Sequence, residues 1–129
     1  MTFFNIIVPF YNVEKWIARC IVSVDKQNYD NYRVVLVNDC GTDDTVSIVE
    51  KLILKKDKFH LLNKEERGGA LSSTYHGIEY IGPADEEVVI VLDGDDWFAD
   101  TEVLSTLDEV YSKEDCLMTY GSYVEYPTG

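Results

Sequence analysis

The sequence predicts an α/β fold of Rossmann type, in which helices flank an open, mostly parallel sheet. Two observations lead to this prediction. Short apolar runs of strand length alternate along the chain with segments of helical period. These runs are continuously apolar, as expected for strands that are buried on both faces of a sheet. Strands that alternate with helices favour right-handed crossovers, so the strands are expected to run parallel.

Local patterns place each element. Strands are expected at residues 3–8, 32–37, 59–62, 87–92 and 116–120. Helices are expected over residues 13–27, from about 43 to 56, over 68–81 and over 101–112. Pro9 is expected to stop the first strand, because proline cannot donate to a strand ladder. Asn12 is expected to cap the first helix, and Asp43 or Asp44 the second.

Length and composition restrict the class of protein. The chain has 129 residues, and we expect residues 1–129 to form a single domain. It carries 11 basic and 24 acidic residues, for a formal net charge of -13. This balance argues against nucleic acid as a partner, because that affinity depends on Lys and Arg at phosphates. It argues equally against an anionic membrane surface. A phosphate-bearing ligand would need a metal ion to bridge it to so acidic a chain.

The cysteines and the apolar segments predict the cellular compartment of the protein. Cys20, Cys40 and Cys116 are odd in number and widely spaced, which favours neither a zinc site nor a disulfide framework. A reduced, cytoplasmic setting is therefore expected. The apolar N-terminus is short and lacks a basic region, so a strand is expected there and not a signal peptide. No stretch approaches the ~20 apolar residues that a membrane span requires.

Polar clusters follow the carboxyl ends of four predicted strands. They occupy residues 9–12, 38–44, 65–69 and 93–96. Ligands of open α/β sheets bind outside these strand ends. The sequence therefore predicts that the four clusters converge on one ligand site.

The strongest signal is "LDGDDW", which follows the fourth predicted strand. Asp93 and Asp95 flank Gly94, so their side chains can point to the same side of a tight turn. Carboxylates at the end of a strand that is expected to be buried repel one another unless a cation neutralises them. Mg²⁺ and Mn²⁺ bind carboxylate oxygens and bridge them to ligand phosphates. The alternative is a turn that caps the next helix, a role open to Asp96 or Asp100.

The other clusters offer contacts to a nucleotide. "VPFYN" has no glycine where a dinucleotide-binding fold carries GxGxxG, which disfavours NAD and FAD. Tyr11 could present its ring to a base, or be a core tyrosine. Asp39 could accept the N3–H of uracil. Arg67 precedes two glycines and could meet a diphosphate, or be a solvated arginine beside a helix start. Asp43 and Asp44 are better explained as acids at a helix start.

In this order, "IIVPFYN", "VNDCGTDDT", "GG…GIE" and "VLDGDDW" resemble the motifs of family 2 glycosyltransferases of the GT-A fold, over essentially the whole chain. The resemblance implies a DxD-type motif that binds Mn²⁺ or Mg²⁺ and the diphosphate of a nucleotide sugar. The implied nucleotide-sugar-binding residues are Pro9, Tyr11, Asp39, Arg67, Asp93 and Gly94, and the implied metal ligands are Asp95 and Asp93. Asp39 would read the uracil of a UDP-sugar. The segment "DEEVVIVLDGDDW", with the tail "YGSYVEYPTG", is also similar to members from large viruses and from sugar-polymer pathways.

The chain departs from the family pattern in three places. Asn38 stands where the family usually has the first of two acids, so Asp39 alone is retained. "STY", at residues 73–75, replaces the frequent Ala-Arg-Asn, which removes a basic residue and leaves Arg67 as its substitute. Family members place the catalytic base, and much of the acceptor site, beyond the position of Gly129.

The resemblance implies a metal-dependent, inverting glycosyltransferase that moves a sugar from a UDP-sugar donor to a glycan or other hydroxyl acceptor. The metal would neutralise the departing diphosphate, and a carboxylate would deprotonate the acceptor. Two alternatives stay open, a nucleotide-sugar-binding module without transferase activity and a nucleotidyltransferase. A nucleotidyltransferase should carry a loop rich in glycine and basic residues where this chain has "PFYN". An unfinished sheet edge would also favour pairing into a homo-oligomer.

Overall fold

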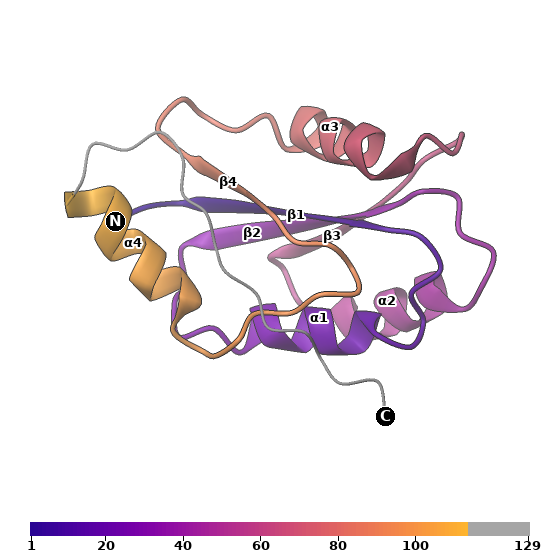
Figure 1. Cartoon of the computed structure of the whole chain (residues 1–129), viewed down its shortest axis with the longest axis horizontal. Helices are drawn as coiled ribbons and strands as arrows, with labels where there is room; N and C mark the ends of the chain where they lie inside the picture. Colours follow the sequence, from indigo (N-terminus) through magenta and orange to yellow (C-terminus); the bar gives the residue numbers. More distant parts are fainter. Residues whose placement is uncertain (114–129) are drawn as a thin grey trace.

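The computed structural model describes residues 1–113 (Figure 1). The elements, in chain order, are β1 (Phe4–Phe10), α1 (Ile17–Asp25), β2 (Tyr32–Asn38), α2 (Thr45–Ile53), β3 (Phe59–Asn63), α3 (Gly69–Ile81), β4 (Val88–Val91) and α4 (Val103–Lys113). The predicted alternation of strands and helices is confirmed over this range. The strand predicted at residues 116–120 lies outside the described residues.

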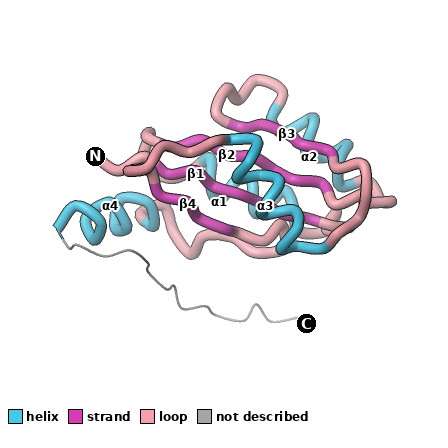
Figure 2. The backbone as a smooth tube through the Cα atoms, turned by 90° about the horizontal axis from the view of Figure 1, so that it is seen from above, coloured by secondary structure: helices cyan, strands magenta, loops and turns pink. Residues whose placement is uncertain are grey.

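The four strands form one parallel sheet in the order β3-β2-β1-β4. The helix α3 covers one face of this sheet, and α1 and α2 cover the other (Figure 1). Seen from above, α3 crosses the middle of the sheet (Figure 2). The predicted α/β fold with a mostly parallel sheet is therefore confirmed.

Side chains of β1 alternate between two apolar clusters, one on each face of the sheet. Phe4, Ile6, Val8 and Phe10 join the larger cluster, which also contains the apolar faces of α1 and α2 and Leu104 of α4. Ile7 faces the opposite way and packs under α3. Burial on both faces is thus confirmed for the two central strands, whose residues are almost all buried.

Gly77 lets α3 lie close to the sheet. A Cβ atom at this position would stand 2.8 Å from Cγ2 of Ile7 and 3.1 Å from Cγ2 of Val37. Contacts this short require neighbouring side chains to shift, so a larger residue would push α3 off the strands. The glycine of the "GIE" motif is therefore explained by the close packing of α3 on β1 and β2.

Pro9 does not stop the first strand, contrary to the prediction, because β1 continues to Phe10. Odd-numbered residues of β1 direct their backbone groups towards β4. Leu92 N donates to the carbonyl of Ile7 (2.9 Å), and Gly94 N donates to the carbonyl of Pro9 (3.0 Å). Because the pairing of β1 with β4 ends at Ile7, the missing N–H of Pro9 removes no ladder hydrogen bond.

Asn12 does not cap the first helix, which was a wrong prediction. The N-cap position of α1 is Trp16, and Asn12 has a left-handed φ of 49°. Its Oδ1 accepts hydrogen bonds from Thr42 N (2.7 Å) and Asp43 N (3.2 Å). Asn12 therefore ties the loop after β1 to the loop after β2, a long-range role that the local pattern did not reveal.

The second helix begins as predicted. Asp44 occupies the N-cap position of α2, and the carboxylate of Asp43 accepts a hydrogen bond from Thr45 N (3.0 Å) and one from Thr45 Oγ1 (2.6 Å). A carboxylate in this place satisfies one of the N–H groups at a helix start. The Asp43 carboxylate thus serves the local structure of this loop, whereas the Asp44 side chain makes no capping hydrogen bond.

The prediction that the fourth strand is buried on both faces is wrong. Val91 is 51% exposed, and the other β4 residues are only partly buried. In the described sheet β4 lies at the edge, next to β1, whereas α3 packs on β1 and β2. An apolar run predicts a strand but not whether the strand is central or at an edge of the sheet, because strand order depends on pairings between segments far apart in sequence. Among residues 1–113, the helices are all too short or too polar to cross a membrane.

Candidate functional site

The carboxyl ends of β1, β2 and β4 surround a hollow of about 190 Å³. Its lining contains the predicted site residues Pro9, Tyr11, Asp39, Asp93, Gly94 and Asp95, together with Ala70 and Ser73 from α3. The predicted site residue outside this lining, Arg67, lies against Tyr11. The structure therefore brings together residues that are up to 86 positions apart, from Pro9 to Asp95.

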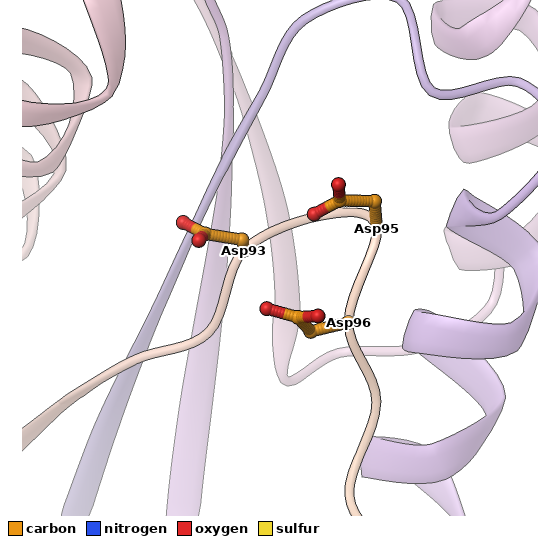
Figure 3. Close-up of side chains that lie close together, drawn as sticks. All are labelled: Asp93, Asp95 and Asp96. Atoms are coloured by element: carbon orange, nitrogen blue, oxygen red, sulfur yellow. The ribbon is translucent and has the colours of Figure 1, made fainter. Parts of the chain in front are cut away.

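The turn after β4 gathers three carboxylates (Figure 3). Asp93, Asp95 and Asp96 each offer an oxygen within 4.8 Å of the others. All three are exposed, so the predicted burial of Asp93 and Asp95 is wrong, and water screens part of the repulsion among the three carboxylates. Partial desolvation, followed by the charge of Asp95, still raises the pKa of Asp93 and of Asp96. A divalent cation would relieve this repulsion, and oxygen ligands are those that Mg²⁺ and Mn²⁺ prefer.

Of the two acids considered for the capping role, Asp100 fills it. Asp100 Oδ1 accepts a hydrogen bond from Glu102 N (2.8 Å), just before α4 begins at Val103. Asp96 instead turns its carboxylate towards Asp93 and Asp95 (Figure 3). The three acids of the turn are thus available to a ligand, and Asp96 is a third candidate metal ligand that the sequence left as a capping residue.

Gly94 holds the acidic turn against the end of β1. Its N–H donates to the carbonyl of Pro9. A Cβ atom on Gly94 would stand 2.6 Å from Cβ of Phe10 and 3.2 Å from Cδ1 of Ile17. Because the Phe10 Cβ is attached to the backbone, it cannot rotate away. The glycine is therefore required for the position of the carboxylates on either side of it.

Cys20 of α1 and Trp16, the N-cap residue of α1, contact the acidic turn and the residue that follows it. Cys20 is buried, and its Sγ lies 3.8 Å from the carbonyl oxygen of Asp93. Burial, with the three aspartates of the turn, raises the pKa of Cys20 to about 12, so the thiol stays protonated and unreactive. Trp97 stacks on Trp16 with ring centroids 6.0 Å apart. These contacts fasten the turn to α1.

Asp39 is a buried carboxylate that also caps α3. Its Oδ1 accepts hydrogen bonds from Lys64 Nζ (2.7 Å) and Gly68 N (2.9 Å), and its Oδ2 accepts one from Gly69 N (2.8 Å). Burial alone would raise the pKa of Asp39, but the hydrogen bonds from Lys64, Gly68 and Gly69 outweigh burial and lower the pKa to about 2. At physiological pH Asp39 is therefore an acceptor only.

Lys64, which sequence reasoning missed, contacts the predicted site residue Asp39. Its side chain is 4% exposed, and its ammonium also donates to Ser72 Oγ (3.1 Å) and Ser73 Oγ (3.4 Å). Asn63 is the register partner of Asn38 in the pairing of β3 with β2, so Lys64 and Asp39 leave the sheet side by side. In the sequence, the only indication is that Lys64 and Asp39 each directly follow a strand. This indication becomes informative only when the register of β3 against β2 is known.

Arg67 contacts two residues of the hollow. The Cζ atom of its guanidinium lies 3.7 Å from the ring centroid of Tyr11. Its Nε lies 3.8 Å from Oδ2 of Asp39. The side chain is 60% exposed, so each of these contacts contributes little stability.

The lowered pKa of Asp39 predicts how stability depends on pH. Its contribution is present above the unfolded pKa of about 3.9 and is lost as the pH falls through about 2. We expect Asp39 to account for a loss of about 2 kcal/mol over this interval. Urea unfolding between pH 5 and 2 measures this loss. The Asp39→Asn variant should show a shallower dependence, and the exposed Asp57→Asn variant the wild-type one. An equal slope in Asp39→Asn would contradict the assignment.

Comparison with known proteins identifies the family. The model of the family described as Glycosyl transferase family 2 matches residues 5–129. Glycosyltransferase GlyG from Streptococcus pneumoniae serotype 4 is 28% identical over 122 residues, which cover 95% of this chain and 39% of GlyG. The poly(ribitol-phosphate) beta-N-acetylglucosaminyltransferase TarS from Staphylococcus aureus is 48% identical over 50 residues, which cover 37% of this chain and 9% of TarS.

Solved structures have the same fold. TarS in complex with UDP-GlcNAc superposes with a TM-score of 0.76 at 32% identity, over 88% of this chain and 32% of that one. The mannosyltransferase PcManGT from Pyrobaculum calidifontis, in complex with GDP-Man and Mn²⁺, has a TM-score of 0.71 at 24% identity, over 79% of this chain and 30% of that one; this likeness concerns the fold alone. The chain thus spans less than half the length of these relatives. Since the family match extends over nearly the whole chain, the protein belongs to glycosyl transferase family 2.

Proposed function

We propose that the hollow binds a UDP-sugar, and that the chain is the donor-binding part of a glycosyltransferase that moves the sugar to a glycan or other hydroxyl acceptor with inversion. One observation carries the proposal. An acidic turn suited to a cation and a diphosphate lines the same hollow as Asp39 and Tyr11, which are suited to a base. The UDP-GlcNAc named for the TarS structure supports a uridine donor.

Asp95 and Asp93 would hold Mn²⁺ or Mg²⁺, with Asp96 as a third available carboxylate. The three oxygens fit such an ion, because hard divalent cations take carboxylate ligands and complete their shell with water and phosphate oxygens. The bound ion would neutralise the diphosphate as it departs. The chain's own contribution is the placement of these carboxylates, which Gly94 and the Trp97–Trp16 contact hold at the end of β1.

Asp39 would select the base. Because its carboxylate stays ionised, it can accept the N3–H of uracil, whereas the N3 of cytosine offers only an acceptor. Tyr11 and Pro9, which line the same hollow, would flank the base. The sugar end would lie towards Asp93 and Gly94. We assign the deprotonation of the acceptor hydroxyl to residues outside the range 1–113.

Calorimetric titration of UDP, with and without Mn²⁺, tests the donor site. Wild type is expected to bind UDP more tightly with Mn²⁺. Asp95→Ala is expected to lose at least tenfold in affinity, because even the outer partners of metal ligands typically contribute about 10–100-fold. Asp57→Ala, which removes an exposed acid before β3 at the opposite edge of the sheet, is the control and should bind as wild type. A folded wild type that binds neither UDP nor Mn²⁺ would refute the proposal.

A further inference from the structure

Arg67 lies across the two residues that would hold the base. Its guanidinium covers the Tyr11 ring at 3.7 Å and its Nε approaches Oδ2 of Asp39 at 3.8 Å. A guanidinium is planar, stacks on aromatic rings and donates N–H groups to carboxylates. Uracil is also planar and also offers an N–H. The side chain and the base therefore compete for the same two partners.

The acceptor capacity of Asp39 sharpens this competition. A carboxylate oxygen has two lone-pair positions. Lys64 Nζ and Gly68 N occupy both positions of Oδ1. Among the described residues, Oδ2 accepts one hydrogen bond, from Gly69 N, which leaves one position. Arg67 approaches this same oxygen, so a base N–H bonded to Asp39 must take the place that Arg67 faces.

The small volume of the hollow also fits an Arg67 side chain that must move before a ligand can bind. Its volume of about 190 Å³ is below the ~300–1,000 Å³ of typical ligand pockets. A second hollow of about 480 Å³ borders the first turn of α3, and its lining includes Arg67, Glu66 and His76. Because the Arg67 side chain is 60% exposed and flexible, it can swing away from Tyr11 at small cost.

We propose that Arg67 is a specificity-determining residue that covers the Tyr11 ring and faces Asp39 until a donor displaces it. The inference rests on the proposed UDP-sugar function. A displaced guanidinium can make a charge-assisted hydrogen bond to a diphosphate. A ligand that carries a diphosphate thus offsets the displacement, whereas a free nucleoside does not. Arg67 therefore favours UDP over uridine.

Titration of uridine and of UDP with Mn²⁺ into wild type, Arg67→Ala and Arg67→Gln tests the proposal. Uridine is expected to bind both variants about three- to tenfold more tightly, since it no longer displaces a stacked, paired guanidinium. UDP is expected to bind them about tenfold more weakly, since a charged hydrogen bond is lost. Lys55→Ala removes an exposed positive charge just after α2, which ends at Ile53, and should leave both affinities unchanged.

The outcomes separate the inference from the proposed function. A lower ratio of UDP affinity to uridine affinity in both Arg67 variants, arising from tighter uridine binding, supports the inference. Uridine binding that is unchanged or weaker in these variants, while wild type binds UDP, overturns the inference alone. Absence of UDP binding to wild type overturns the proposed function and the inference with it.

Discussion

Replacing Lys64 with methionine is expected to destabilise the protein by about 3 kcal/mol and to weaken UDP binding. Methionine keeps the length and volume of the lysine but leaves the Asp39 carboxylate buried without its cation. Breaking a buried ion pair by removing one partner typically costs about 3–5 kcal/mol. The lower end is expected here because Gly68 N and Gly69 N still donate to Asp39. Urea unfolding at pH 7 measures the loss.

A surface pair of the same length provides the control. Lys56 Nζ lies 2.7 Å from Oδ2 of Asp25, as near as Lys64 lies to Asp39, but these two side chains are 34% and 39% exposed. Lys56→Met should therefore cost no more than about 1 kcal/mol. If Lys64→Met costs as little, burial does not decide the strength of the Asp39 pair.

The double variant Lys64→Met/Asp39→Asn isolates the role of charge. It removes both ions, so its loss of stability is expected to be smaller than the sum of the two single losses. Its UDP affinity should stay low, because the N3–H of uracil would then meet a neutral amide in place of a carboxylate. Additive losses of stability in the double variant would contradict a direct coupling of Lys64 with Asp39.

Replacing Gly94 with alanine is expected to weaken Mn²⁺ binding at least tenfold, although all three aspartates remain. The added methyl group would lie 2.6 Å from Cβ of Phe10, so the turn must move away from β1. Overpacking of this kind also destabilises by about 1–3 kcal/mol. Carboxylates displaced with the turn no longer match the geometry of the ion. Calorimetric titration of Mn²⁺ and urea unfolding measure the two effects.

Gly77→Ala separates the loss of geometry from the loss of stability. Its methyl group would meet Ile7 and Val37 beneath α3, at 2.8 Å and 3.1 Å, away from the acidic turn. Its stability is expected to fall by a similar amount, about 1–3 kcal/mol, while its Mn²⁺ affinity stays at the wild-type value. Equal losses of Mn²⁺ affinity in both variants would show that Gly94 acts through general stability only.

Local sequence determined the types of the elements and predicted most of the polar residues that line the hollow. Periodicity distinguishes strand from helix because side chains repeat every two residues in one and about every 3.6 in the other. The polar clusters at Pro9, Asp39 and Asp93 could be assigned to one site before their contacts were known, because parallel strands bring their carboxyl ends to a single edge. This reasoning needs only the order of elements along the chain.

Only the tertiary structure decided the order of the strands in the sheet, their register and the exposure of the site residues. β4 carries an apolar run yet lies at the edge of the described sheet, and the aspartates that follow it are exposed. Lys64 meets Asp39 because of the register of β3 against β2. Asn12 bonds to a neighbouring loop, and Arg67 lies over Tyr11. Each depends on residues distant in sequence, because a pairing is chosen by the energy of the whole packed arrangement and leaves no periodic trace in the segments that take part.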